Sequence, residues 1–315
     1  MVEPILRGPE RPNEQRALLG HLMVLAAATL FAVNGTISKV ILASGISSSE
    51  LAEVRSSGAF AGLAVLVLAF RRHAVRLQRR ELPFLVCFGV GGLAFVQWFY
   101  FLAIHRLAIG IALLIQYLAP LLVALWARFV FNERVRRRIW IALALALAGL
   151  TLVAEIWEGL ALDGFGAAAA LIAAVAYAAY VLLAEHGLRR RDPISLSCYG
   201  FLFAAFFWTV VQPWWNFPGG RVDDRVSLLG NLSHLHLPVW ALMTSMVLAG
   251  TIVPFGLVVA ALRHISATRL GIVAMVEPVA ASLVAYAWLD ESLSAAQLIG
   301  GAIVLAAILL AQTAR

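Results

Sequence analysis

The chain has 315 residues, of which 62% are hydrophobic and only 13% are charged. Soluble domains carry about 25% charged residues, so this composition excludes a soluble protein and indicates a polytopic α-helical membrane protein. The long, continuous apolar runs exclude a membrane β-barrel, whose strands are short and alternate in polarity. The net charge of +7 does not indicate nucleic acid, because the basic residues fall between apolar segments, where they act as topology signals.

Ten transmembrane helices are expected along the chain, since one crossing takes roughly 20 apolar residues. Their expected ranges are 19–43, 51–70, 83–104, 109–131, 138–156, 165–186, 194–215, 238–262, 266–289 and 293–313. The polar, proline-containing segment 1–18 is expected to be a disordered cytoplasmic tail. The segment 216–237 is expected to be an irregular extracytoplasmic loop.

The basic residues predict the orientation in the membrane. If the N-terminus is inside, eighteen of the 24 Lys and Arg residues fall in inner segments. Loops rich in Lys and Arg generally stay on the cytoplasmic side of a membrane. Both termini are therefore predicted to be cytoplasmic. The outer loops contain Arg106, Arg221 and Arg225, and the predicted helices contain Lys39, Arg55 and Arg128.

One pattern occurs twice at a constant spacing of 158 residues. Pro120 matches Pro278 and Glu133 matches Glu291, and each proline lies inside an apolar segment that ends in a short polar hinge. Five helices per half is an odd number, so the second half must run in the opposite sense. The sequence therefore predicts two inverted five-helix repeats, 19–156 and 165–313, with a substrate site near the midplane between them.

Glu277, directly before Pro278, is the first candidate site residue. It is expected about 16 Å along its helix, near the bilayer centre, where lipid offers a carboxylate neither water nor a partner. One interpretation is a proton-titrating or cation-facing group, and the other is a structural carboxylate that locks the bend. Pro120 and Pro278 each leave a backbone carbonyl without its helical partner, which indicates either a gating break beside the site or a packing kink.

Lys39 and Arg55 lie about one turn from the outer ends of their predicted helices. Together they either hold a substrate carboxylate at the outer mouth, or reach the headgroups and pair with Glu50 and Glu53. Arg128 is similarly shallow on the inner side, where snorkelling is the simpler interpretation.

Uncharged polar residues also occur within the predicted helices. Asn34, Gln97 and Gln116 either contact the substrate or bridge helices by hydrogen bonds. Several aromatic residues either line a cavity or pack against lipid and other helices: Trp98, Tyr100, Tyr117, Tyr177 and Tyr180. Cys87 and Cys198 lie in apolar segments and indicate neither a disulfide nor a metal site.

These motifs resemble the drug/metabolite transporter superfamily, and its EamA-domain branch in particular. The motifs that carry the resemblance are 261–264, 276–278, 289–293 and 298–301 in the second half and, more weakly, 103–108, 118–120 and 132–134 in the first. Phe31 stands where the family often has Trp, and Arg55 matches a frequent arginine. Ala119 stands before the first proline, where a symmetric site would need a glutamate.

The resemblance implies the ten-helix inverted-repeat fold and export or exchange of amino acids, other small metabolites or drugs, proton-coupled in some members and uncoupled in others. The sequence contains no phosphate-binding glycine loop, H-E-x-x-H or G-x-S-x-G motif, which argues against an ATP-driven pump and an enzyme. No cofactor is expected.

The predicted function is secondary transport, most simply export, of small metabolites such as amino acids or related polar compounds by alternating access in the inner (plasma) membrane. The expected partners are this small-molecule substrate and membrane lipids, with protons and a second copy of the chain as further candidates and no nucleic acid. Two alternatives stay open: a non-transporting receptor or assembly subunit, and an uncoupled facilitator or channel.

Overall fold

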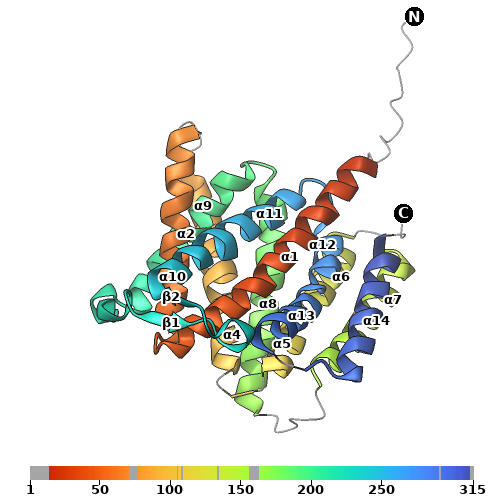
Figure 1. Cartoon of the computed structure of the whole chain (residues 1–315). Coiled ribbons are helices and arrows are strands. Elements are labelled where there is room, and N and C mark those ends of the chain that lie inside the picture. The colour runs from red at the N-terminus through yellow and green to blue at the C-terminus, as the bar shows by residue number, and fades with distance from the viewer. Residues whose placement is uncertain are drawn as a thin grey trace, which may run out of the picture.

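The computed structural model of the chain describes residues 14–70, 77–104, 106–107, 109–132, 135–155, 163–290 and 292–312. Within these ranges the chain forms a helical bundle with one small hairpin (Figure 1). The helices of the first half are α1 (Glu14–Ala43), α2 (Ser48–Phe70), α3 (Leu82–Val86), α4 (Phe95–Ile104), α5 (Ile109–Gln116), α6 (Ala119–Phe129) and α7 (Arg137–Val153). Those of the second half are α8 (Gly164–Gly187), α9 (Pro193–Val211), α10 (Val239–Val247), α11 (Val253–Ala261), α12 (Ala267–Ala274), α13 (Glu277–Leu289) and α14 (Ala295–Gln312).

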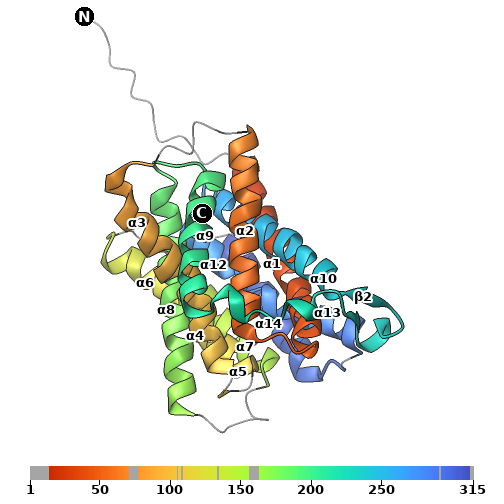
Figure 2. The ribbon, with the colours of Figure 1, turned by 90° about the vertical axis from the view of Figure 1, so that its left-hand side faces the viewer.

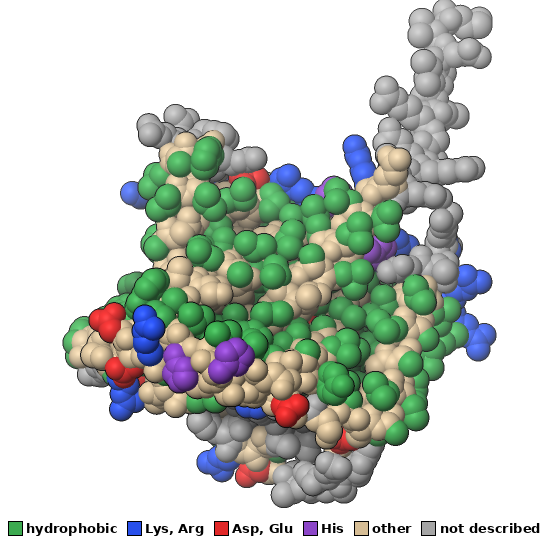
Figure 3. Space-filling view, in the orientation of Figure 1, with side chains coloured by type: hydrophobic (Ala, Val, Ile, Leu, Met, Phe, Trp, Pro, Cys, Tyr) green, Lys and Arg blue, Asp and Glu red, His purple; other side chains and the backbone are tan. Residues whose placement is uncertain are grey.

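Eight helical stretches among the described residues are long and apolar enough to cross a membrane. They are Gln15–Ala43, Ser48–Phe70, Arg79–Ala103, Ala112–Phe129, Gly164–Gly187, Pro193–Val211, Val239–Ala261 and Ala267–Leu289. The two other expected helices correspond to α7 and α14, which have 17 and 18 residues. Figure 3 shows apolar side chains over the middle of the visible face, with charged side chains towards its margins. The protein is therefore a multi-pass membrane protein, as its composition predicts.

The largest differences between the expected and the observed helix boundaries are at α1 and α9. α1 begins at Glu14, before the expected start at 19, and residues 1–13 of the expected tail lie outside the described ranges. α9 ends at Val211 although a helix was expected up to 215. The cause is Pro213, because a residue that precedes proline is driven out of the helical region, and Gln212 has φ −127° and ψ 85°.

The segment 216–237 was expected to be irregular, but it contains a hairpin. β1 (Arg225–Ser227) pairs antiparallel with β2 (His236–Pro238), and short 3₁₀ turns surround the pair: η5 (Trp214–Asn216), η6 (Gly219–Arg221) and η7 (Gly230–Leu232). Strands of three residues are too short to give an alternating pattern in the sequence. Figure 2 shows the hairpin projecting from the side of the bundle, beside α10 and α13.

An apolar cluster, here called the outer cluster, holds the hairpin to the bundle. It joins the last turns of α1, the start of α2, α10 and the hairpin segment, and it includes Ile46, Leu228 and Trp288. Trp288 Nε1 donates a hydrogen bond to the Leu228 carbonyl oxygen at 2.8 Å, and Arg221 Nη1 donates one to the Gly45 carbonyl oxygen at 2.6 Å. The hairpin is thus tied both to α13 and to the turn between α1 and α2.

The last three helices of each half begin at equivalent positions. The starts of α5 and α12, of α6 and α13, and of α7 and α14 are each separated by 158 residues. Asn132 and Asp290, at the same separation, both have a positive φ, of 53° and 60°. Residues other than glycine adopt such values uncommonly, so the hinge repeats as a conformation. The neighbouring hinge residues Glu133 and Glu291 lie outside the described ranges.

A π-helical segment interrupts one long helix in each half. η3 (Cys87–Ala94) connects α3 and α4, and η8 (Leu248–Ile252) connects α10 and α11. Such segments change the direction of the side chains that follow them and are frequent at functional sites. The sequence gives no recognised signal for them.

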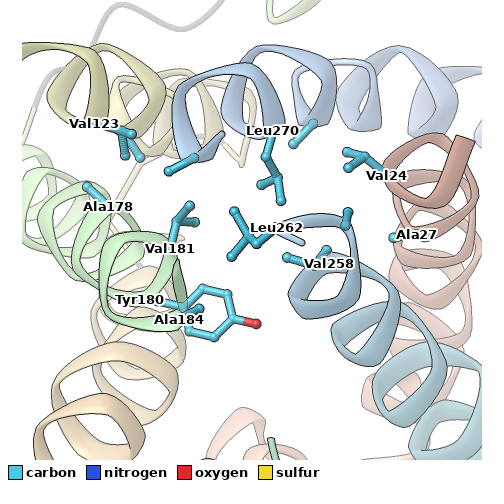
Figure 4. Close-up of a cluster of buried hydrophobic side chains, with 14 of the residues drawn as sticks. Val24, Ala27, Val123, Ala178, Tyr180, Val181, Ala184, Val258, Leu262 and Leu270 are labelled. Atoms are coloured by element: carbon cyan, nitrogen blue, oxygen red, sulfur yellow. The ribbon is translucent and has the colours of Figure 1, made fainter. Parts of the chain in front are cut away.

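The main apolar core lies where helices of both halves meet. Figure 4 shows Val181, Leu262 and Leu270 pointing towards one another, with Val258 beside them. α7 and α14 form a separate close pair at one side of the bundle (Figure 1). A Cβ atom added at Gly149 would lie 2.7 Å from the carbonyl oxygen of Gly300, so the absence of side chains allows these backbones to approach.

Both ends of the described chain lie at the same end of the bundle. The start of α1 and the end of α14 are found there in both views, whereas α2 begins at the opposite end (Figures 1 and 2). The hairpin and the outer cluster also lie towards that opposite end, which is called the outer end below.

Candidate functional site

Two broken helices meet inside the bundle. α5 ends at Gln116 and α6 begins at Ala119, whereas α12 ends at Ala274 and α13 begins at Glu277. In each case a proline is the second residue after the break, where its missing N–H interrupts the helical hydrogen bonds. A Cβ atom added at Gly271 of α12 would lie 3.0 Å from Pro120 Cβ, so α12 packs directly against the first break.

Glu277 connects the two breaks through its side chain. It is the first residue of α13 and lies near the middle of the membrane span Ala267–Leu289. Its carboxylate accepts a hydrogen bond from the hydroxyl of Tyr117. Tyr117 lies in the turn between α5 and α6 and is 6% exposed. A buried hydrogen bond therefore crosses from one half of the chain to the other.

Arg55 of α2 supplies the opposite charge. It lies within electrostatic range of Glu277, and its Nε donates a hydrogen bond to Thr251 Oγ1 at 3.1 Å. The guanidinium carbon lies 5.6 Å from the centroid of the Phe255 ring, a distance at which cation and ring attract. Thr251 Oγ1 in turn donates to the Met246 carbonyl oxygen at 2.9 Å. Because these two residues are five apart, the π-helical segment η8 is what places Thr251 to hold Arg55.

Two further tyrosines face the same carboxylate. Tyr100 of α4 and Tyr177 of α8 both lie within electrostatic range of Glu277. The Tyr177 ring stacks on Tyr180 with centroids 6.2 Å apart, and Tyr180 meets Phe255 edge-on at 5.8 Å. Six residues from both halves thus form what is called the central polar cluster below: Arg55, Tyr100, Tyr117, Tyr177, Thr251 and Glu277.

The central polar cluster combines complementary chemistry with accessible surface. Arg55, Tyr100, Tyr177 and Glu277 are only half-buried, although the helices that carry them pack together. A guanidinium recognises a carboxylate group, and a carboxylate recognises an ammonium group. The arrangement can therefore bind a small molecule that carries both charges. Among the described residues, no group of three His, Cys, Asp or Glu side chains could hold a metal ion.

The other predicted site residues lie in different settings. Asn34 of α1 is 4% exposed and packs against Gly250, next to Thr251. Gln97 is 6% exposed, and its Nε2 donates to the Leu93 carbonyl oxygen at 3.4 Å. Gln116 and Pro278 are half-buried, Pro120 is buried, and Lys39 and Arg128 are exposed. The structure therefore brings Arg55, Tyr117 and Glu277 together and places Lys39 on the surface of α1.

Sequence reasoning missed Thr251 and Phe255. Thr251 follows Gly250 in the middle of an otherwise apolar span, and a hydroxyl group at that depth is a signal that could have singled it out. Phe255 gave no signal, because one phenylalanine among many in apolar segments is not distinctive.

Comparisons with known proteins agree with this architecture. The model of the EamA-like transporter family matches residues 18–154 and 164–313, one match in each half. A solved crystal structure with 19% sequence identity covers 95% of this chain and 96% of its own, with a TM-score of 0.75.

Two curated relatives are similar over much of the chain. An uncharacterized transporter of Archaeoglobus fulgidus is 28% identical over 212 residues, which are 67% of this chain and 70% of that protein. The threonine/homoserine exporter RhtA of Escherichia coli K12 is 25% identical over 249 residues, 78% and 77% of the two chains. The resemblance found in the sequence is thereby confirmed. This chain is a membrane transporter that belongs to the EamA-like transporter family.

Proposed function

We propose that this protein is a secondary transporter that exports small zwitterionic metabolites, amino acids or compounds built like them, across the inner membrane. The observation that carries the proposal is that Arg55 lies within electrostatic range of Glu277, where the two broken helices meet. The guanidinium group would take the substrate carboxylate, and Glu277 would take the ammonium group. The similarity to a threonine/homoserine exporter supports this substrate class.

The proposed topology has ten crossings in two inverted halves, with both termini in the cytoplasm. It is supported by the excess of basic residues in the segments near the end where α1 begins and α14 ends and by the repeated helix pattern of the two halves. Membrane-impermeant thiol labelling tests this. A cysteine that replaces Ser227 in the hairpin should react in intact cells, and one that replaces Arg189 should react only after lysis.

The proposed movement is centred on α13. α6 buries Ala119, Pro120, Val123, Ala124 and Ala127, whereas α13 has no buried side chain among the described residues. An element with few fully buried side chains opens at a lower free-energy cost than one that is anchored in the core. We infer that α13 turns at the Pro278 break and exposes the central polar cluster alternately to the two sides.

Counterflow in proteoliposomes tests the proposed function. Vesicles that contain the purified protein and unlabelled threonine or homoserine should accumulate the labelled amino acid from outside. Glu277→Gln keeps the size of the side chain and removes its charge, so saturable accumulation should be lost. Lys39→Gln is the matched control, because it removes an exposed charge outside the central polar cluster and should leave accumulation within about twofold of the wild type, the usual range for surface substitutions.

Two outcomes would reject the proposal. Unchanged accumulation by Glu277→Gln would remove this carboxylate from substrate binding. The absence of counterflow for threonine, homoserine and a wider panel of amino acids in the wild-type protein would reject the substrate class.

A further inference from the structure

Glu53 of α2 is a buried acidic residue that the transport site does not use. Its side chain is 0% exposed, and neither carboxylate oxygen has a hydrogen-bond partner among the described residues. Ser56, one turn further along α2, is also 0% exposed, and its hydroxyl oxygen lacks a partner in the same part of the chain. Leu51 and Val54 beside it belong to the outer cluster. Two polar groups therefore stand together in apolar surroundings near the outer end.

The helices that pack against α2 offer little charge to compensate Glu53. These helices are α1, α4, α9, α10 and η8, and α4, α9, α10 and η8 contain no Asp, Glu, Lys, Arg or His. Their titratable groups are Glu14, Arg16, His21 and Lys39 on α1, Tyr100 on α4, and Cys198 and Tyr199 on α9. The hairpin segment shares the outer cluster with α2, and its titratable groups are Arg221, Asp223, Asp224, Arg225, His234 and His236. Among the described residues, Glu50 is the charged group that acts electrostatically on Glu53.

The charged groups of α2 itself do not compensate Glu53 either. Glu50 is within electrostatic range and has the same charge, and its carboxylate already accepts a hydrogen bond from the Ser47 N–H at 2.7 Å. Arg55 follows by two residues, a spacing at which helical side chains do not face each other, and it bonds to Thr251.

The buried Glu53 and the half-buried Glu277 therefore differ in what compensates their charge. Glu277 accepts a hydrogen bond from Tyr117 and has Arg55 within range, whereas Glu53 has neither a donor nor a cation in the described part of the chain. Removing an ionised carboxylate from water without a partner costs several kcal/mol, and a neutral carboxyl group costs much less. This contrast separates a charged binding group, Glu277, from a group that is stable here only with a proton.

We propose that Glu53 is a proton-binding site that links closure of the outer end to protonation. In the closed arrangement the carboxylate takes up one proton from solution and becomes a neutral carboxyl group. When the outer end opens, a step that rests on the proposed transport function, water reaches α2 and the same proton is released. Because the closed state binds more protons than the open state, a fall in pH favours closure and a rise in pH favours opening.

Infrared spectroscopy of the purified protein in a detergent without ester or carboxyl groups tests the bound proton directly. A protonated carboxyl group has a C=O stretching band that a carboxylate lacks. We expect this band at neutral pH in the wild-type protein, in E50Q and in E277Q, and its loss in E53Q. A band that persists in E53Q, or that is missing from the wild type, overturns the proposal. The infrared measurement uses no substrate, so its result does not depend on whether the counterflow assay of the proposed function succeeds.

A thiol reporter placed away from Glu53 tests the link to closure. Ile46 is 2% exposed in the outer cluster, so Ile46→Cys, with Cys87 and Cys198 replaced by alanine, should react only when the outer end opens. The labelling rate with a membrane-impermeant reagent is divided by the rate for the unfolded protein at the same pH, which removes the effect of thiol ionisation. This ratio should increase as the pH rises. The increase should disappear in E53Q and remain in E50Q. Labelling that does not depend on pH, or that depends equally on pH in E53Q, contradicts the link.

Discussion

α6 and α13 occupy the same position in the two halves, yet they differ in chemistry and packing. Both begin beside a proline after a break, at positions separated by 158 residues. α6 begins with Ala119 and buries five side chains, whereas α13 begins with Glu277 and buries none among the described residues. The first break provides an apolar support with buried side chains, and the second provides a charged group on a helix whose described side chains all keep some exposed surface.

This difference shows that the two copies of a duplicated fold can keep the same backbone pattern and differ in their side-chain chemistry. The backbone pattern of break, proline helix and left-handed hinge is present in both copies. A carboxylate precedes the proline in one copy only, and Tyr117 of the other copy donates a hydrogen bond to it. The site is therefore asymmetric although the architecture repeats, and four substitutions test where the asymmetry lies.

Ala119→Glu copies the sequence of the second break into the first and should have the largest effect. Ala119 is 1% exposed, so the substitution buries a carboxylate without a prepared partner, at a cost of roughly 3–5 kcal/mol. The expected result is loss of monodisperse protein in size-exclusion chromatography. Ala119→Ser is the control and should remain monodisperse. A stable, active Ala119→Glu variant would show that the two breaks are interchangeable.

Tyr117→Phe removes the hydrogen bond that crosses between the breaks. Hydrogen bonds to charged groups contribute roughly 1.5–3 kcal/mol, so the apparent affinity for substrate should fall at least about tenfold. Concentration-dependent counterflow measures this. Tyr199→Phe is the control, because the Tyr199 ring packs against Arg191 outside the central polar cluster. An unchanged affinity in Tyr117→Phe would mean that the two breaks do not cooperate in binding.

Gly271→Ala inserts a methyl group between α12 and Pro120. The added Cβ would lie 3.0 Å from Pro120 Cβ and 3.2 Å from its Cα, so the two breaks must separate slightly. Overpacking of this kind costs typically 1–3 kcal/mol, visible as a lower melting temperature in detergent. Gly256→Ala is the matched control, since its Cβ would meet nothing within 4 Å. Equal melting temperatures for both variants would contradict the close contact.

Trp288→Phe should have the smallest effect. It removes the hydrogen bond to the Leu228 carbonyl oxygen and keeps most of the ring, at a cost of about 1 kcal/mol. We expect faster amide hydrogen exchange in the last turn of α13 and no change in α6. Trp98→Phe, on α4, serves as the control. Equal exchange of α13 in the wild type and in Trp288→Phe would show that the hairpin does not restrain this helix.

The overall class and much of the helix pattern could be predicted from the sequence, because membrane insertion requires long apolar segments and prolines interrupt them in recognisable ways. The expected helix 266–289 and the break at Pro278 correspond closely to α12 and α13. The hairpin and both π-helical segments could not be predicted. The hairpin segment and η8 make contacts between residues far apart in the chain, Trp288 with Leu228 and Arg55 with Thr251, which a local sequence pattern does not reveal.

The site could be predicted only in part. Glu277 and Arg55 were conspicuous as charges within apolar helices, and the structure places them close together. Lys39 was equally conspicuous, but it is exposed on α1, since the face of a helix that turns inward depends on its neighbours. Glu53 was interpreted only as a partner for basic residues, because its complete burial is a property of the packed bundle.

The central claim is that Arg55 and Glu277 bind the two charges of one substrate. A competition experiment with threonine and threoninol tests it most directly, because threoninol lacks the carboxylate. The measured quantity is the ratio of their potencies as competitors of labelled threonine counterflow. We expect a strong preference for threonine in the wild type and in Lys39→Gln, and loss of that preference in Arg55→Met, whose apolar side chain cannot recognise a carboxylate. A preference that survives in Arg55→Met would contradict the proposed site.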